Sequence, residues 1–274
     1  MKILTLDEIA KLAPAALADR PDPRVSARYA FINTTEAINL LMEMGWQPVE
    51  ALQGRVRLDQ NRKSAWHEIV FRRPEDAPVR EAGDVVAQLS ILNNHSGRGS
   101  YQLIGGLMRL ICKNGLMIHR LGGGIRIRHT REGVREMRKG VDNWVGFLPR
   151  LFGMARSWQK IRPDSGQIRE LAAAGLRLRY GEREEKWPAT PETVALATRR
   201  PEDRGDDLWT TFNRIQENVT RGGPEVPGKI NARGRRRRIH PLLQPRMRLR
   251  LSHGLWREAA RIGGGLEMEE GMAS

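Results

Sequence analysis

The spacing of the apolar residues changes near Thr130, and this change limits the folds that the sequence can adopt. In the first half, apolar residues form short runs rich in β-branched and aromatic side chains, bounded by polar or glycine-containing segments, as expected for strands. From Thr130 onward they recur every three or four residues, which is the period of an amphipathic helix. We therefore expect an α+β fold: a small, mainly antiparallel β-sheet in the N-terminal half, covered by helices from the C-terminal half.

Four segments of the first half carry the strand pattern. The segment 101–111 is apolar enough for a strand or a buried helix, and Gly105-Gly106 favours a strand with a bulge. The other expected strands lie at 46–58, 65–73 and 84–92, and residues 29–32 could form a further short one.

Helix signals flank this strand region. Residues 35–44 have helical apolar spacing between N-cap oxygens at 33–35 and a glycine at position 45. The apolar stripe from Thr130 to residue 155 predicts one amphipathic helix, or two that are broken near Pro149. Further helices are expected at 165–178, at 192–198, from Asp206 to the glycines at 222 and 223, and as a last short helix from Leu255.

The chain carries far more positive than negative charge: 47 Lys and Arg residues stand against 32 Asp and Glu residues, and the net charge is +15. This balance is typical of a nucleic-acid-binding protein, and it also fits an acidic protein partner or an anionic membrane surface. Most of the cations are arginines, whose guanidinium groups bind phosphate in a fixed fork. An arginine bias also arises in GC-rich genomes, but such a bias does not account for the net charge.

Candidate phosphate-binding residues fall in four places. The arginine cluster at 233–238 could contact phosphates or form a solvated basic loop. The loop 93–100 combines polar donors with glycines, which suits a phosphate or an ordinary hairpin loop. Arg109 lies in an apolar run, so it either forms a buried pair or contacts a phosphate. The residues singled out are Arg233, Arg235, Arg236, Arg237 and Arg238 in the cluster, Asn94, His95, Ser96 and Arg98 in the loop, Arg109, and Arg135, Arg138 and Lys139 on the long helical segment.

Two further sets of residues have a structural and a functional interpretation. Trp158, between Arg156 and Lys160, is the best candidate among the tryptophans for an exposed base-stacking side chain, whereas most of the others are expected in the core. Asn213 and Glu217 lie on the polar side of their helix, where they could bind a partner or, as we favour, join neighbouring loops.

The sequence shows no convincing catalytic or metal-binding constellation. His119 and His129 lack metal-ligand spacing, and no Cys/His cluster could hold zinc. Cys112 is the only cysteine, so no disulfide can form within the chain, and its Leu and Ile neighbours are typical of an inert core thiol. We therefore expect a binding protein rather than an enzyme, with no cofactor and no metal.

The N-terminal residues do not have the pattern of a signal peptide, and no stretch of the sequence has the pattern of a membrane span. Residues 1–12 include Asp7 and Glu8 and lack the apolar stretch of a signal peptide. No segment approaches the roughly 18 apolar residues that a membrane span needs. We expect a soluble, cytoplasmic protein that does not bind membranes.

Three segments of the sequence carry distinctive motifs. The first is a Ser/His/Gly-rich loop, Leu92-Asn93-Asn94-His95-Ser96-Gly97-Arg98-Gly99-Ser100, followed by Arg109-x-x-Cys112-x-Asn114. The others are Leu208-Trp209-x-x-Phe212-Asn213-x-x-Gln216-Glu217-Asn218 and Leu249-x-Leu251-x-x-x-Leu255-Trp256. Together they resemble the family called domain of unknown function 932. The resemblance covers roughly residues 30 to 260 and implies an origin in phages, plasmids or integrated elements, but it implies no particular activity.

The expected order of helix, three strands and helix also resembles the core of phage single-strand annealing proteins. Such proteins lay a nucleic-acid strand in a basic groove, hold its backbone and leave its bases free. This resemblance concerns topology alone, which does not establish function.

These observations lead to one preferred function and two alternatives. We expect binding of nucleic acid, with single-stranded DNA favoured, in recombination or replication of a mobile element. The alternatives are a protein-interaction module that binds a host defence protein, and a nucleic-acid-processing enzyme; a homo-oligomer is compatible with each. The expected organisation is an extended segment at 1–28, a single domain at 29–262 with a basic loop at 221–246, and a disordered tail at 263–274.

Overall fold

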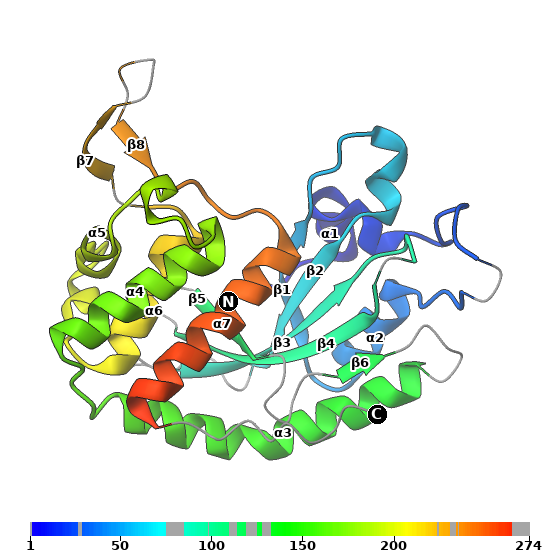
Figure 1. The fold of residues 1–274 in the computed structure, drawn as a ribbon. Helices are drawn as coiled ribbons and strands as arrows, with labels where there is room; N and C mark the ends of the chain where they lie inside the picture. The colour runs from blue at the N-terminus through cyan, green and yellow to red at the C-terminus, as the bar shows by residue number, and fades with distance from the viewer. Residues whose placement is uncertain are drawn as a thin grey trace.

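A computed structural model gives the fold of the protein (Figure 1). It describes residues 2–26, 29–74, 85–97, 99–109, 114–118, 125–127, 133–223, 225–230, 234 and 236–264. The sheet precedes most of the helices in the chain, as the change in apolar spacing predicts, and the expected α+β class is confirmed.

The main sheet is antiparallel, and its first five strands lie side by side in the order of the sequence. The segment that fitted a strand or a buried helix forms a strand, β4, and residues 29–32 form no strand. Strand β6 pairs with the first residues of β4, and β5 pairs with its later residues. The bounds are β1 Gln47–Gln53, β2 His67–Arg72, β3 Val85–Asn93, β4 Tyr101–Arg109, β5 Asn114–Ile118 and β6 Ile125–Ile127.

One face of the sheet packs against helices α2 (Thr34–Glu43) and α3 (Gly133–Trp158). Every second residue of β2 and β3 joins the core on this face, among them Ile69, Phe71 and Leu89, and the residues between them are also buried, on the other face. Gly105 of β4 lets α3 approach closely, because a Cβ atom there would lie 2.2 Å from the Trp144 ring. The core therefore depends on a glycine at this point of the sheet.

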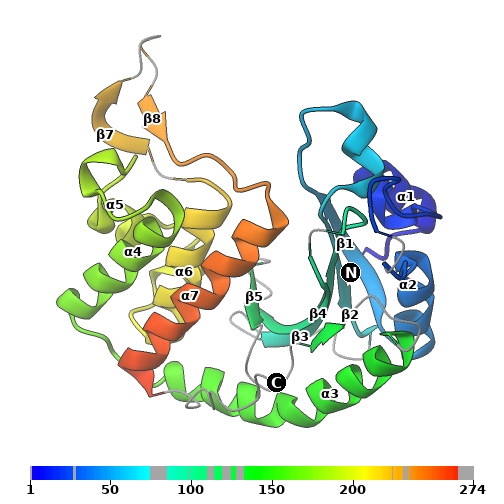
Figure 2. The same cartoon turned by 45° about the vertical axis from the view of Figure 1, so that its right-hand side comes forward.

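Helix α3 links the sheet to the remaining helices and runs beneath both (Figures 1 and 2). It passes Pro149 as one continuous helix, which decides between the two sequence-based alternatives. Among the helices of the described residues, none combines the length and the apolar character needed to cross a membrane. Beyond α3 the chain forms the helices α4 Ser165–Tyr180, α5 Pro191–Leu196, α6 Leu208–Thr220 and α7 Pro245–Gly263, with the 3₁₀ turns η4 Glu184–Lys186 and η5 Pro201–Arg204.

The sequence predicts an extended segment at 1–28, but the N-terminal segment is helical in two places. Thr5 and Glu8 form a capping box at the start of helix α1 (Leu6–Leu12), and the 3₁₀ turn η1 (Pro14–Leu17) follows. Ile9 is fully buried in the same core as the sheet. The segment is therefore part of the folded unit, and the Thr-x-x-Glu spacing was its signal.

The segment 221–246 is not a single basic loop. It contains a hairpin of β7 (Glu225–Ile230) and β8 (Arg236–Arg238), and α7 already begins at Pro245 rather than near Leu255. Proline is favoured in the first turn of a helix, where its missing N–H costs nothing. The predicted disordered tail lies outside the described residues, apart from its first two glycines.

Candidate nucleic-acid interface

The connection between β1 and β2 carries a group of exposed cations. The Gly54 amide closes it by donating to the Trp66 carbonyl at 2.7 Å, and the 3₁₀ turn η2 (Asp59–Ser64) forms its second half. Four side chains of this connection extend into solvent: Arg55, Arg57, Arg62 and Lys63.

Asp22 ties this connection to the N-terminal segment. Its buried carboxylate accepts hydrogen bonds from Arg24 Nε at 2.7 Å, Arg24 Nη2 at 2.6 Å and Ser64 Oγ at 2.9 Å. These bonds, those of Arg24 above all, outweigh desolvation and hold the pKa of Asp22 well below its ordinary value. A permanently charged group therefore positions the end of η2.

A second group of cations comes from the hairpin and the start of α7. The described side chains of Arg238 and Arg246 are exposed. The chain between them is anchored, since Gly223 N donates to Ile239 O at 3.0 Å and Leu242 N donates to Thr220 O at 2.7 Å. No acidic residue occurs in the sequence between Glu225 and Glu258, so nothing within this stretch neutralises its arginines.

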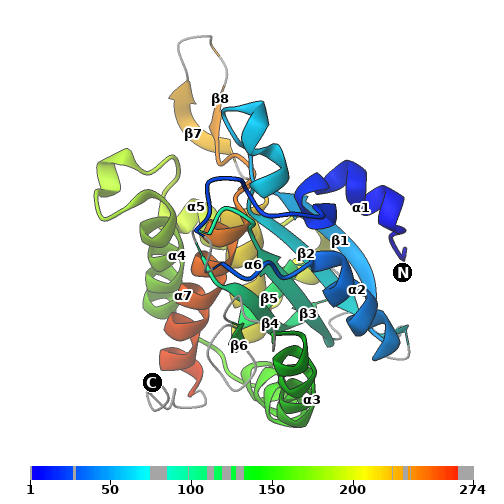
Figure 3. The same cartoon turned by 90° about the vertical axis from the view of Figure 1, so that its right-hand side faces the viewer.

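The two groups lie on the same side of the molecule. In Figures 1, 2 and 3 the β1–β2 connection and the β7–β8 hairpin both extend from the top, and α3 lies at the bottom. Packing joins them directly, because a Cβ atom at Gly54 would lie 2.9 Å from Gln244 Oε1 and 3.6 Å from Pro245 Cδ. We call this surface the basic face; its residues are Arg55, Arg57, Arg62, Lys63, Arg238 and Arg246.

The structure does not bring all predicted phosphate-binding residues together. Arg138 and Lys139 are exposed on α3, and this helix lies at the opposite side of the fold from the β1–β2 connection and the hairpin (Figure 1). The placement of Arg98, Arg233 and Arg235 lies outside the described residues, as do the side chains of Arg135, Arg236 and Arg237.

The polar loop after β3 is packed into the fold rather than open to a ligand. Asn94 and His95 are fully buried, and the Asn94 side chain accepts from the Ser96 amide at 3.0 Å and hydroxyl at 2.6 Å. The His95 backbone bonds to Ser64 and Asp22. Our assignment of Asn94 and His95 as phosphate ligands is therefore not supported by their position; their residue types indicate polarity but not burial.

A buried chain of polar groups underlies this loop. His67 Nδ1 donates to the Ala65 carbonyl at 3.0 Å, so in the neutral ring Nε2 accepts from Thr34 Oγ1 at 3.1 Å, and Asn93 Nδ2 donates to that same hydroxyl. The His95 ring lies 5.1 Å from the His67 ring. Burial lowers the pKa of His67 to about 4, and the Ala65 carbonyl only partly opposes this.

Acid is expected to destabilise the protein through His67. The unfolded ring binds a proton near its ordinary pKa of 6.5, and the folded ring only near 4. The free energy of unfolding therefore falls as the pH drops from 6.5 to 4, and the full contribution of the neutral ring is present above this window. The loss reaches about 3 kcal/mol. Urea unfolding at several pH values would measure it, and His67→Gln should flatten the curve between pH 6.5 and 4. An unchanged pH dependence in that variant would contradict this account.

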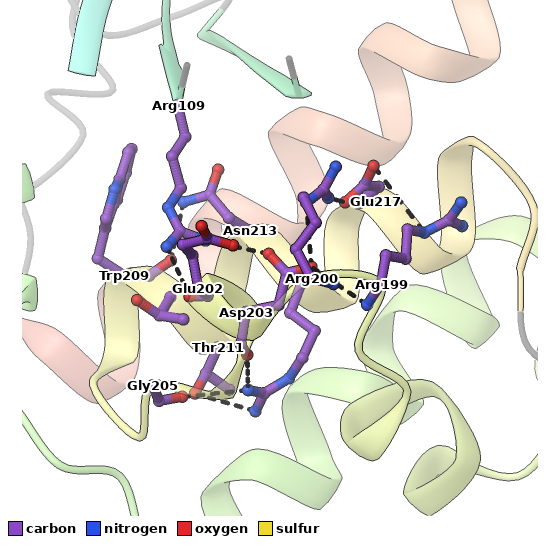
Figure 4. A network of polar contacts seen from close by, with 12 residues as sticks. Arg109, Arg199, Arg200, Glu202, Asp203, Gly205, Trp209, Thr211, Asn213 and Glu217 are labelled. Atoms are coloured by element: carbon purple, nitrogen blue, oxygen red, sulfur yellow. Dashed lines mark hydrogen bonds and ion pairs between the residues drawn. The ribbon is translucent and has the colours of Figure 1, made fainter. Parts of the chain in front are cut away.

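Arg109 is buried and forms a structural pair, the first of its two sequence-based alternatives (Figure 4). Its Nη1 lies 3.5 Å from Asp203 Oδ1, and its Nη2 donates to the Glu202 carbonyl at 3.0 Å. The Asp203 carboxylate also accepts from the backbone amides of Arg199 and Arg200, each at 3.2 Å. Arg109 thus joins β4 to turn η5, and a phosphate could not reach it in this conformation.

The polar residues of α6 extend this network inside the helical part. Glu217 is buried and ion-paired with Arg199 and Arg200 (Figure 4). Gln216 Nε2 donates to Ser252 Oγ of α7 at 2.6 Å, and Asn218 Nδ2 donates to carbonyls at the end of α5. The structural interpretation of this polar strip is therefore supported.

The second face of the sheet meets α7 through another charged group. Arg248 Nη1 lies 3.3 Å from Glu50 Oε1 and 3.8 Å from Glu68 Oε2, and Ser90 Oγ donates to Glu68 Oε1 at 3.2 Å. Burial raises the pKa of the Glu68 carboxyl, although Arg248 opposes it. Desolvation acts to lower the pKa of Arg248, but Glu68 and Glu50 outweigh it and raise that pKa. This contact fixes the start of α7 on the sheet.

The structure assigns no metal-binding role to the His, Cys, Asp and Glu side chains that it describes. The described part of the chain contains no group of three His, Cys, Asp or Glu side chains that could hold a metal ion. Cys112, His119 and His129 lie outside the described residues.

Sequence reasoning missed most of the basic face. The sequence places Arg55 and Arg57 in the expected strand 46–58, does not single out Arg62 or Lys63, and gives Trp66 only as one of several tryptophans, most of them expected in the core. The observed strand β1 ends at Gln53, and the alternation Arg55-Val56-Arg57-Leu58 beyond it is the signal for a surface that combines apolar and basic side chains.

Comparison with known proteins places the chain among relatives of undefined activity. The family model described as Domain of unknown function (DUF932) matches residues 23–248, so the segment from Leu249 to Trp256 lies just beyond it. Two relatives from Escherichia coli (strain K12), the UPF0380 proteins YfjQ and YafZ, are 31% and 32% identical over 253 residues, covering 92% of this chain and 89% of each relative. No solved structure matches the chain.

Proposed function

The chain belongs to the domain of unknown function 932 family, and from this premise we propose that it binds nucleic acid, preferentially single-stranded DNA, through the basic face. The family description assigns no activity, so the proposal rests on the chain itself. One observation carries it: two segments far apart in sequence, each with exposed Arg and Lys or Arg side chains, extend from the same side of the molecule.

Such a surface would hold a strand by its phosphates. Each Arg or Lys that neutralises a phosphate releases counterions from the nucleic acid, which gives affinity without base specificity and makes it depend on salt. Guanidinium groups add bidentate geometry. The role is therefore binding without chemistry, in recombination or replication of a phage, plasmid or integrated element, and the cytoplasm is the proposed location.

The test is binding of a labelled single strand and of its duplex across a salt series, with two matched variants. Arg55→Gln/Arg57→Gln removes two charges from the basic face, and Arg138→Gln/Lys139→Gln removes two from α3 on the opposite side. Log affinity falls as log salt rises, and for the single strand we expect this fall to be shallower in the first variant by about 1.4 in slope, roughly 0.7 per lost phosphate contact. The α3 variant should keep the wild-type slope.

The outcomes separate the possible surfaces. A shallower slope in the α3 variant alone would move the interface to the opposite side of the molecule. Replacing Arg235 to Arg238 with Ala tests whether the hairpin contributes to the same surface. No binding to either form at low salt would contradict the proposal and favour an acidic protein, such as a host defence protein, as the partner.

A further inference from the structure

Trp66 adjoins the basic face. It directly precedes β2, and its carbonyl holds the Gly54 amide at the start of the cationic connection. Its ring packs against Leu92 and Ile104 on the second face of the sheet. Gly99 makes room for the ring, since a Cβ atom there would lie 2.5 Å from Trp66 Cη2. The indole is thus fixed in place yet only half-buried.

Arg246 lies over this fixed ring. Its Cζ is 4.8 Å from the centroid of the Trp66 ring, and the side chain is exposed. A guanidinium is planar, so one of its faces can contact the indole while the other receives a second flat group. The first turn of α7, held on the sheet by Arg248, sets its position.

Apolar side chains are interleaved with the cations of the basic face in the sequence. Val56 and Leu58 alternate with arginines in the connection, and Leu243 lies next to Gln244, which contacts Gly54. Their exposed fractions are 38%, 55% and 37%. A charged phosphate backbone gains nothing from such apolar groups, whereas an unpaired base can bury its flat apolar face against them.

We propose that the Arg246–Trp66 stack is a base-stacking platform, on which one unpaired base of a single strand lies against the Arg246 guanidinium. This inference rests on the proposed function and deepens it, because it names the groups that distinguish an unpaired strand from a duplex. Arg55 and Arg57 hold the neighbouring phosphates. A base in a duplex is already stacked and paired, so it cannot use the platform without leaving its helix.

The experiment compares an oligonucleotide with an abasic strand of the same length and charge, in DNA and RNA forms. We expect the wild-type protein to bind the abasic strand about tenfold more weakly, the effect of one lost base stack. Arg246→Lys keeps the charge but removes the planar group, so this variant should bind both strands with nearly equal affinity. Trp66→Phe keeps a ring under Arg246 and should abolish a base-dependent change in tryptophan emission.

The results separate this inference from the proposed function. Equal wild-type affinity for the normal and the abasic strand would overturn the platform and leave phosphate binding intact. An unchanged preference for bases in Arg246→Lys would also overturn it. Failure of both strands to bind at low salt would overturn the platform together with the proposed function.

Discussion

Replacing Asp203 with Asn is expected to lower the free energy of unfolding by about 3–5 kcal/mol, because it removes the carboxylate that ion-pairs with the buried Arg109 guanidinium. Both side chains are almost completely buried, with 4% of Arg109 and 3% of Asp203 exposed. Asn has nearly the same shape as Asp, so packing is kept while the charge is lost. Urea unfolding followed by circular dichroism measures the effect.

Two comparisons isolate the buried charge. Arg169 and Glu192 form an ion pair at 2.7 Å, but both are more than half exposed, so Glu192→Gln should cost less than about 1 kcal/mol. The double variant Arg109→Met/Asp203→Asn removes both charges, keeps a side-chain oxygen that can accept from the amides of Arg199 and Arg200, and should recover much of the stability lost by Asp203→Asn. A loss below 1 kcal/mol in Asp203→Asn would show that the pair contributes little to folding.

The overall fold was accessible from the sequence because its signals are local. The period of two in 65–73 and the caps around 35–44 act within a few residues, and both elements formed as predicted. The choice at Pro149 was not local, since α3 packs against both the sheet and the later helices. The start of helix α7 was expected near Leu255 instead of Pro245, because the alternation of arginine with apolar residues at 246–251 suggests a strand as much as a helix.

The site was less accessible because residue type does not determine burial. Asn94 and His95 have donors suited to a phosphate, but they serve the inside of the loop. Arg109 and Asp203 are 94 positions apart, and no periodicity relates them. The basic face is likewise assembled by contacts between Gly54 and the start of α7, which only the fold reveals.

Trp158 gives the second large expected effect, and it corrects the prediction of an exposed stacking residue. The side chain is fully buried, and its ring lies 4.7 Å from the Trp256 ring, 5.7 Å from the Phe212 ring and 6.3 Å from the Trp209 ring. Its Nε1 donates to the Gly264 carbonyl at 3.1 Å. The flanking Arg156 and Lys160 are exposed, but the tryptophan between them points into the core.

Trp158→Ala should therefore lower the free energy of unfolding by about 3–5 kcal/mol, the usual cost of deleting a large buried aromatic side chain. Leu196, with 75% of its surface exposed, supplies the control: Leu196→Ala should change stability by no more than about 0.5 kcal/mol. Circular dichroism is the appropriate signal, because the substitution alters tryptophan fluorescence directly.

The cluster around Trp158 joins the end of α3 to α6 and α7 and lies away from the basic face. Trp158→Ala should therefore weaken folding without changing the salt slope of DNA binding, measured at temperatures where the variant is folded. A wild-type stability combined with a lost preference for single strands would instead restore Trp158 as a ligand-contacting residue.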